Sequence, residues 1–305
     1  MSEDKSMPLK DLYAGWAHAM ATRHDMPLQD LRGMFDHWGD VTAEPRGVDY
    51  IEVDAGGVQS MWVLPKNCAM DRTLFCTHGG GYVLGSMYTH RKLFGHFAKA
   101  VGCRALIPDY KLAPEHVHPG PLDDVVLAYR WLLEVEKVPP NRIAFLGDSA
   151  GGALAITAML RARQMGLPLP VASVPLAPYI DMEALGASYE TNHGKDALGS
   201  RAGTLGAVSA FLGENGNCKD PLANPLYADL RGLPPMLVQV GGHDVLLDDS
   251  RRFYERAKAA GVDVTLQVAP EMQHVFHFLA GNLPEADQAI ANAAAWLRPK
   301  LGLAV

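Results

Sequence analysis

The sequence predicts an α/β fold in which a mostly parallel, eight-stranded sheet is covered by helices on both faces and carries a helical cap. The main observation is an alternation that starts near residue 73, where short apolar runs typical of buried strands are separated by longer stretches of helical periodicity. Such alternation is typical of parallel strands joined by crossover helices. A second observation is one interval of about 50 residues that is too long for a simple crossover.

Eight segments have the composition of strands. The first two, Val48–Val53 and Val58–Leu64, flank an Ala-Gly-Gly turn and are expected to form an antiparallel hairpin. The other six strand candidates are Leu74–Thr77, Arg104–Pro108, Ile143–Leu146, Val171–Leu176, Met236–Val240 and Val264–Val268. The main helical stretches are Leu122–Glu136, Gly151–Gln164, Asp249–Ala260 and Pro284–Leu297. We expect the whole chain, residues 1–305, to form one domain.

Two segments are expected to form the cap over one pocket. Residues 1 to about 45 contain two amphipathic patterns, separated near Pro27, that have no place in the layers of the sheet. Their apolar positions are Leu9, Leu12, Trp16 and Met20, then Leu28, Leu31, Phe35 and Trp38. The second segment, residues 181–228, lies in the long interval and includes a helical stretch around Gly203–Leu212 and a polar loop, Gly213–Asp220.

The composition excludes several classes of function. Hydrophobic residues make up 48% and charged residues 20%, as in an ordinary globular protein, and the net charge of −7 disfavours nucleic acid and anionic membranes as partners. The first residues lack the apolar core of a signal peptide, and no run approaches the roughly 18 apolar residues of a membrane span. The sequence therefore predicts a cytoplasmic protein, in which the widely spaced Cys68, Cys76, Cys103 and Cys218 are thiols.

A candidate nucleophile lies at the end of the third strand of the alternating part. The strand Ile143–Leu146 is followed by Gly147-Asp148-Ser149-Ala150-Gly151 and then by a helical stretch. Such a tight turn forces Ser149 into a strained backbone conformation, and Gly147 and Gly151 remove Cβ atoms that would collide. The Ser149 hydroxyl is then exposed at a helix N-terminus, where N–H groups and the helix dipole favour negative charge. The alternative for the motif alone is a turn with a capping serine.

A glycine-rich loop follows the strand Leu74–Thr77, with the sequence His78-Gly79-Gly80-Gly81-Tyr82. Successive glycines let main-chain N–H groups approach a substrate carbonyl closely. The alternatives are a flexible loop or a phosphate cradle. A dinucleotide site is disfavoured because the run does not supply Gly-x-Gly-x-x-Gly before a helix.

These two motifs, 71 residues apart, resemble those of the bacterial hormone-sensitive-lipase family of α/β-hydrolases. A third segment between them, Asp109-Tyr110-Lys111-Leu112-Ala113-Pro114-Glu115, is similar to the family's Asp-Tyr-Arg-Leu-Ala-Pro-Glu, with Lys111 in place of arginine. The likeness spans roughly Thr73 to Trp296. It implies an α/β-hydrolase core, a helical cap, and esterase activity on small acyl substrates without a cofactor. It also implies that Gly80, Gly81 and Ala150 donate to the oxyanion, while His78 and Glu115, with Gly79 in the same motif, support the glycine loop.

The acid and the base are expected to follow Ser149 in that order, each beyond the end of a strand. Asp244 follows the strand Met236–Val240, His274 follows Val264–Val268, and both occupy the family's positions. Nearby residues of the same types are decoys: Asp248 and Asp249 are expected to start the next helix, and His277 to pack within an apolar segment. His116 and His118, near Asp123 and Asp124, are not expected to bind a metal.

The sequence therefore predicts a serine carboxylesterase that uses Ser149, His274 and Asp244 on short- to medium-chain acyl esters, with no cofactor and no metal. A lactone hydrolase would use the same residues on a cyclic ester and is the nearest alternative. A non-catalytic ligand-binding protein of this fold is more remote, because His274 is retained. An amidase or an epoxide hydrolase is more remote still. The oligomeric state is left open, with a homodimer among the arrangements that the sequence allows.

Overall fold

The structure is a computed structural model that describes residues 7–23 and 25–304. Within these residues the chain forms an eight-stranded sheet in the order β1-β2-β4-β3-β5-β6-β7-β8. Strands β3 to β8 run parallel, whereas β2 pairs antiparallel with both β1 and β4. The strand bounds are β1 Val48–Asp54, β2 Gln59–Pro65, β3 Ala69–Thr77, β4 Cys103–Pro108, β5 Ile143–Asp148, β6 Ala172–Leu176, β7 Met236–Gly241 and β8 Val264–Ala269. The predicted mostly parallel sheet is confirmed.

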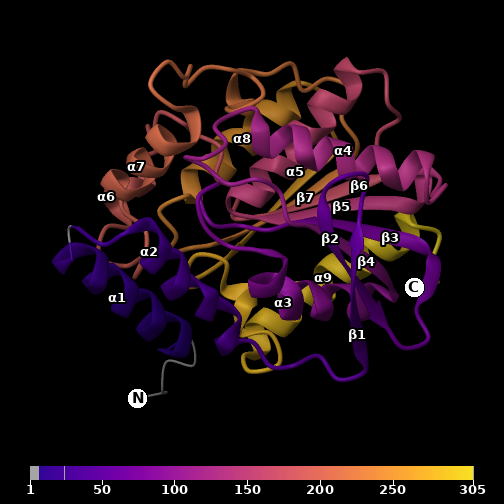
Figure 1. The fold of residues 1–305 in the computed structure, drawn as a ribbon, viewed down its shortest axis with the longest axis horizontal. Coiled ribbons are helices and arrows are strands. Elements are labelled where there is room, and N and C mark those ends of the chain that lie inside the picture. Colours follow the sequence, from indigo (N-terminus) through magenta and orange to yellow (C-terminus); the bar gives the residue numbers. More distant parts are fainter. Residues whose placement is uncertain (1–6, 24, 305) are drawn as a thin grey trace.

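Helices cover both faces of the sheet (Figure 1). Side chains alternate along each strand, so Phe75 of β3 enters one hydrophobic cluster while Leu74 and Cys76 enter the other. The first cluster is shared with α4 (Gly120–Glu134), α5 (Ala150–Gln164) and α8 (Leu247–Ala259). The second is shared with α3 (Met87–Val101) and α9 (Pro284–Lys300). The sheet therefore has a buried apolar layer on each side.

The two segments predicted to form the cap lie together at one end of the sheet, on the left of Figure 1. The first contributes α1 (Met7–Thr22), α2 (Leu28–Phe35) and the 3-10 helix η1 (Asp36–Val41), and the second contributes α6 (Ser188–Thr191) and α7 (Arg201–Leu212). Residues 1–6 and 24 of the predicted cap lie outside the described residues. That these segments act as a cap remains a prediction.

Two boundaries differ from the sequence-based expectation. The second amphipathic helix ends at Phe35, so Trp38 lies in η1 instead. The backbone of η1 lies close to α3, and a Cβ on Gly39 would be 2.7 Å from the Thr89 carbonyl oxygen. Strand β3 starts at Ala69 rather than Leu74, because its first residues extend the backbone ladder to β4 with a register shift. Hydrophobic periodicity does not predict either boundary, because both depend on backbone contacts with another element.

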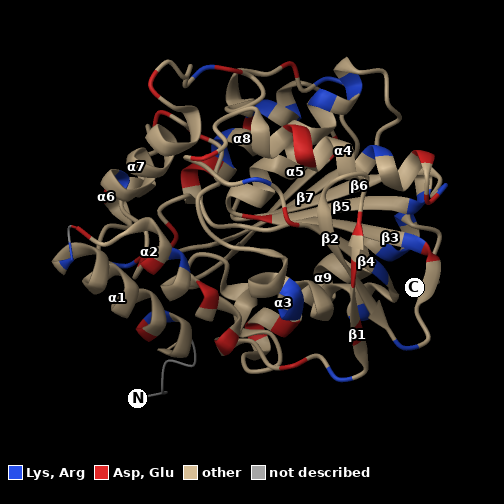
Figure 2. Cartoon of the chain, in the orientation of Figure 1, with Lys and Arg blue, Asp and Glu red and all other residues tan. Residues whose placement is uncertain are grey.

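The charged residues lie mainly on the outer surfaces of the helices and loops. Acidic and basic residues are interspersed along the ribbon in the view of Figure 2. Among residues 7–23 and 25–304, no helix has both the length and the apolar character needed to cross a membrane.

Candidate active site

Ser149 stands at the turn between β5 and α5, with φ 52° and ψ −120°. A non-glycine residue rarely adopts a positive φ, and such strain persists only where the surroundings enforce it. The two flanking glycines allow it here. A Cβ on Gly151 would lie 2.0 Å from the Thr77 carbonyl oxygen, and one on Gly147 would lie 2.3 Å from that of Gly151. The turn predicted from the motif is present, and Ser149 is 6% exposed.

The glycine loop lies directly after β3 and also depends on glycine geometry. Gly80 has φ 119° and Gly81 has φ 60°, and a Cβ on Gly80 would lie 2.1 Å from the Leu84 carbonyl oxygen. Among the described residues, neither the Gly80 nor the Gly81 N–H donates to another protein group. Both N–H groups are therefore available to a substrate oxygen, as an oxyanion hole requires.

The supporting residues that the family resemblance implies hold the loop in different ways. The His78 ring bonds the Gly79 carbonyl oxygen through Nδ1 (2.9 Å) and stacks on Tyr110, whose hydroxyl donates to the His78 carbonyl oxygen (2.7 Å). Burial lowers the pKa of His78 to about 3, so the ring is neutral. Glu115 does not contact the glycines. It binds Arg32 of α2 with both carboxylate oxygens, and Arg32 in turn donates to the Val83 carbonyl oxygen just after the loop.

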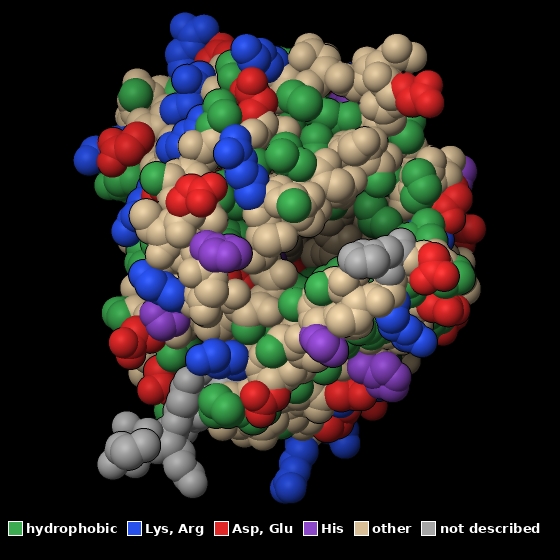
Figure 3. Space-filling view, turned by 90° about the vertical axis from the view of Figure 1, so that its left-hand side faces the viewer, with side chains coloured by type: hydrophobic (Ala, Val, Ile, Leu, Met, Phe, Trp, Pro, Cys, Tyr) green, Lys and Arg blue, Asp and Glu red, His purple; other side chains and the backbone are tan. Residues whose placement is uncertain are grey.

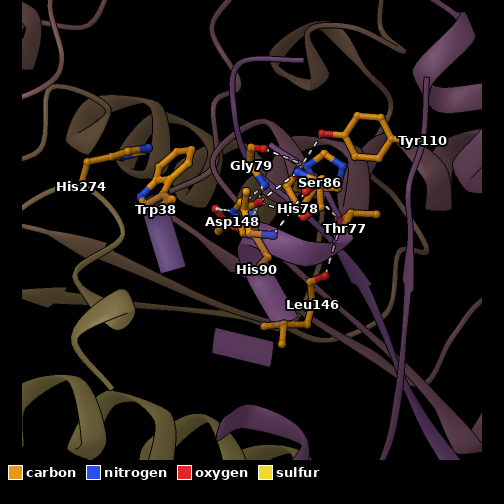
Figure 4. A network of polar contacts seen from close by, with 12 residues as sticks. Trp38, Thr77, His78, Gly79, Ser86, His90, Tyr110, Leu146, Asp148 and His274 are labelled. Atoms are coloured by element: carbon orange, nitrogen blue, oxygen red, sulfur yellow. Dashed lines mark hydrogen bonds and ion pairs between the residues drawn. The ribbon is translucent and has the colours of Figure 1, made fainter. Parts of the chain in front are cut away.

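A buried cluster between the loop and the nucleophile was not predicted from the sequence. The Gly79 N–H lies 3.2 Å from both Asp148 Oδ1 and His90 Nε2, and His90 Nε2 lies 3.2 Å from Asp148 Oδ2 (Figure 4). Thr89 Oγ1 donates to the Ser86 carbonyl oxygen, so it accepts from His90 Nδ1 at 2.7 Å. No motif in the sequence pointed to His90, because its role depends on where α3 lies.

Asp244 and His274 lie together, as their order after the strands predicted. His274 Nδ1 is 2.8 Å from Asp244 Oδ2, and Asp244 Oδ1 accepts the Leu246 N–H (2.8 Å). A bond from Nδ1–H to the carboxylate leaves Nε2 as the free base. Burial works to lower the pKa of His274, but the charge and hydrogen bond of Asp244, helped by Asp196, raise it to about 9.

Asp248, Asp249 and His277, the neighbouring residues of the same types, bind groups other than the predicted catalytic residues. Asp248 accepts the Ser188 N–H and Asp249 accepts the N–H groups of Ile180 and Asp181, and both aspartates lie in the first turn of α8. His277 is fully buried, its Nε2 lies 3.1 Å from Gln239 Oε1, and burial lowers its pKa to about 3. These contacts agree with the structural roles expected for all three residues.

Several residues that sequence reasoning missed hold the acid and base loops in place. Asn192 donates to the carbonyl oxygens of Gly242 (3.0 Å) and Asp244 (2.8 Å). Asp196 accepts the Val245 N–H (2.9 Å) and the N–H groups of Leu198 and Gly199. The side chain of Gln273, next to His274, bonds the backbone of Ala197 and Lys195. Asn192, Lys195, Asp196 and Ala197 all lie in the interval 181–228, and no motif in that interval pointed to them.

One cavity of about 330 Å³ joins these parts. Its floor includes the predicted catalytic residues and loop glycines, namely Ser149, Asp244, His274, Gly80 and Gly81. Its walls come from both predicted cap segments, including Met20, Leu31, Phe35 and Trp38 on one side and Gly203, Thr204, Ala207 and Ala210 of α7 on the other. The face that carries these segments is hollowed near its centre (Figure 3). The structure thus brings the separate motifs of the sequence to one mainly apolar pocket.

The described residues contain no group of three or more His, Cys, Asp or Glu side chains placed to hold a metal ion. His118 instead contacts Asp220 of the polar loop, with Nε2 3.2 Å from Oδ2. Lys111 donates to Asp124 from Nζ (3.0 Å) and from its backbone N–H (3.0 Å). Cys76 and Cys103 are buried in β3 and β4, and the four cysteines are free thiols.

Comparisons with known proteins agree with this architecture. Residues 74–278 match the model of a family described as having the alpha/beta hydrolase fold. The chain is 40% identical to an acetyl-hydrolase of Streptomyces hygroscopicus, over 82% of this chain and 83% of that protein. It is 38% identical to an esterase of Acinetobacter venetianus, over 72% and 73% of the two chains. The crystal structure of an esterase from the bacterial hormone-sensitive lipase family superposes with a TM-score of 0.91 at 42% identity, covering 99% of this chain and all of that one.

The chain therefore belongs to the α/β-hydrolase family. Within that family it is of the hormone-sensitive-lipase type, as the resemblance in its motifs implied.

Proposed function

We propose that the protein hydrolyses small dissolved esters of short- to medium-chain acids through an acyl-enzyme on Ser149. The protein is a carboxylic-ester hydrolase, since it belongs to the α/β-hydrolase family and is similar to proteins named acetyl-hydrolase and esterase. The observation that carries the proposal is that Ser149 and the Asp244–His274 pair line the same cavity as Gly80 and Gly81, whose N–H groups donate to no other group of the described residues.

In the proposed acylation step, Ser149 Oγ attacks the ester carbonyl carbon while His274 Nε2 takes the hydroxyl proton. Asp244 holds Nδ1–H and stabilises the imidazolium that forms. The N–H groups of Gly80, Gly81 and Ala150 face the developing oxyanion, where donors placed in advance stabilise the transition state. When the tetrahedral intermediate collapses, the bond to the alcohol oxygen breaks and His274 returns its proton to that oxygen.

Deacylation uses the same groups in the reverse order. A water molecule gives a proton to His274 Nε2 and attacks the acyl carbon, and the oxyanion donors stabilise the second intermediate. Breaking the bond to Ser149 Oγ releases the acid and returns the proton to the serine. The balance is one ester and one water consumed, with one acid and one alcohol formed.

The dimensions of the cavity support small substrates. Its volume of about 330 Å³ is near the lower end of the roughly 300–1,000 Å³ of typical small-molecule sites. The α7 residues along its wall are small, with Ala207 close enough that a Cβ on Gly81 would lie 3.3 Å from it. Acyl chains of roughly two to eight carbons should therefore be turned over best.

Cyclic esters are the second candidate class, because the proposed triad would act on a lactone in the same way. The names of the relatives, acetyl-hydrolase and esterase, favour linear esters. A cytoplasmic location and a homodimer, which the sequence suggested or allowed, stay predictions.

A substrate panel tests the proposal. Purified protein should hydrolyse p-nitrophenyl acetate, butyrate and hexanoate faster than the laurate or palmitate ester, and faster than simple lactones. Ser149→Ala at the same concentration controls for background hydrolysis. Faster hydrolysis of emulsified long-chain triglyceride than of dissolved butyrate would contradict the size limit, and a lactone that exceeded every linear ester would favour the second class.

A further inference from the structure

A tyrosine of the first helix binds the backbone of the proposed catalytic histidine. The Tyr13 hydroxyl donates to the His274 carbonyl oxygen at 3.0 Å, across 261 residues of sequence. The same hydroxyl oxygen accepts the Nε1–H of Trp38 at 3.0 Å. Tyr13 is fully buried and Trp38 is 2% exposed, so water does not compete for either bond.

The chemistry of the three groups fixes the direction of these two hydrogen bonds. An indole Nε1–H can only donate and a carbonyl oxygen can only accept, so the Tyr13 hydroxyl proton must point to His274. The Tyr13 ring is held by Trp16, with centroids 5.8 Å apart, and by an edge contact with Trp38. Trp38 itself stacks on Phe278 at 5.1 Å. The hydroxyl is thus carried on a rigid aromatic cluster rather than a mobile side chain.

The backbone that Tyr13 contacts is strained. Val275 has φ 44° and ψ 48°, in the left-handed region that a β-branched residue seldom adopts. The His274 carbonyl belongs to the peptide plane that joins His274 to Val275, so a bond at this oxygen opposes the rotation that would relax Val275. Strained backbone of this kind persists only where the surrounding contacts enforce it.

Trp38 also connects the two sides of the active site. Its ring lies 5.4 Å from the His90 ring, edge to face, and His90 belongs to the cluster that binds Gly79 of the glycine loop. On the other side its indole N–H donates to the Tyr13 hydroxyl oxygen. The first predicted cap segment therefore contacts the base directly and the oxyanion loop through one further residue.

We propose that Tyr13 is a positioning residue whose hydroxyl, oriented by Trp38, holds the His274–Val275 peptide and so directs the His274 imidazole between Asp244 and Ser149. The inference rests on the proposed function, because it assigns His274 the role of base. It gives the N-terminal segment a part in the chemical step besides its place in the pocket wall.

The primary test is Tyr13→Phe, which removes one oxygen and keeps the ring. With p-nitrophenyl butyrate, kcat should fall roughly 10- to 100-fold while KM stays within about twofold, because small misplacement of a catalytic group is costly. The matched control is Tyr129→Phe, which also removes a hydroxyl that donates to a backbone carbonyl oxygen (Pro168, 2.8 Å). Tyr129 belongs to the hydrophobic cluster on the opposite face of the sheet from Tyr13. That variant should lose comparable stability and keep its kcat.

A second variant series tests the strain argument. Val275→Gly relieves the positive φ, whereas Val275→Ala removes nearly the same side chain and retains most of the strain. Adding Tyr13→Phe should therefore lower kcat by a smaller factor in the Val275→Gly background than in the Val275→Ala background. Equal factors in the two backgrounds would show that the hydroxyl does not act through this peptide.

The labelling rate of Ser149 by phenylmethanesulfonyl fluoride, read by intact mass, provides a measurement independent of ester choice. The reaction forms an Oγ–S bond, expels fluoride and needs a base for the serine proton, so Tyr13→Phe should slow it in parallel with kcat. If the wild-type protein is labelled but hydrolyses no ester, the proposed function is contradicted. The labelling rates of wild type and Tyr13→Phe can then still be compared. A Tyr13→Phe protein with kcat and labelling rate within twofold of wild type would overturn the inference. If Tyr13→Phe does not fold, Trp38→Phe replaces it, and a labelling rate equal to wild type in that variant would overturn it as well.

Discussion

The nucleophile side of the site and the histidine side are built from different kinds of contact. On the nucleophile side, Gly79–Gly81 and Gly147–Gly151 are two short motifs whose geometry follows from missing Cβ atoms and from the strand that precedes each one. On the histidine side, Asp244 and His274 lie in loops that are held by Tyr13, Asn192, Asp196 and Gln273. Local backbone geometry defines the two glycine motifs of the first side, which the Asp148–His90 cluster then joins. On the second side, long-range hydrogen bonds define the positions of the loops themselves.

This difference explains why the two sides should respond differently to substitution. On the nucleophile side, a methyl group added at Gly80, Gly147 or Gly151 would collide with backbone atoms of a neighbouring segment. On the histidine side, each bond is one of several, so its loss should shift the imidazole without removing the fold. The following predictions test that contrast, from the largest expected effect to the smallest.

The largest effect is expected from Gly151→Ala, because its Cβ would lie 2.0 Å from the Thr77 carbonyl oxygen. We expect loss of folded protein or of several kcal/mol of stability, since overpacking against backbone has no cheap relief. Gly15→Ala is the matched control: the site in α1 is exposed with nothing within 4 Å of the added Cβ, and stability should rise by up to about 1 kcal/mol. Equal melting temperatures for the two variants would contradict the account.

Asp148 should show an intermediate effect that depends on the replacement. Asp148→Ala leaves the Gly79 N–H and His90 without a carboxylate partner, and kcat should fall roughly 10- to 100-fold because the oxyanion loop loses its anchor. Asp148→Asn can still accept from Gly79 and donate to His90 Nε2, so its kcat should lie within about fivefold of wild type. Steady-state kinetics on one short ester measures both, and an asparagine variant as impaired as the alanine variant would show that charge, not hydrogen bonding, matters there.

Asp196 should change the pH dependence more than the rate. With a pKa near 9, His274 must lose a proton to act as base, so kcat/KM should rise with pH through that region. Asp196 is one of the charges that raise this pKa, so Asp196→Asn should move the acid limb to lower pH by up to about one unit. Asp248→Asn, on the neighbouring turn but bound to Ser188 and Arg251, serves as the control and should leave the limb in place. If kcat/KM of Asp196→Asn rose with pH over the same range as in wild type, this electrostatic role would be excluded.

Asp249 should affect only stability. Burial raises its pKa from 3.8 to about 8, so unfolding lets it ionise more easily. Its contribution to stability is therefore present below its unfolded pKa and is lost as the pH rises through about 8. In wild type the melting temperature should therefore fall between pH 5 and pH 9. In Asp249→Asn this fall should be smaller by several degrees, as thermal unfolding at the two pH values would show. An unchanged slope would mean that the carboxyl group ionises normally.

The same contrast between local and long-range contacts limits what the sequence could predict. Periodicity and short motifs report local geometry, and they predicted the succession of strands and helices after residue 73, the turn at Ser149 and the places of Asp244 and His274 after their strands. His90, Asp196 and Tyr13 carry no such signal, because each acts through an element that only the folded chain brings near. Glu115 shows the same limit: the motif indicated support for the glycine loop, yet the contact runs through Arg32 of α2.

The most direct test of the account compares His274→Ala with His277→Ala, two histidines three residues apart. We predict that His274→Ala lowers kcat on p-nitrophenyl butyrate by at least about 10⁴-fold, and that combining it with Ser149→Ala costs little more, because the two residues act as one unit. His277→Ala, which removes a buried neutral ring bonded to Gln239, should lose stability but retain kcat within about threefold in the folded fraction measured by circular dichroism. Near-normal turnover in His274→Ala together with lost turnover in folded His277→Ala would contradict the account.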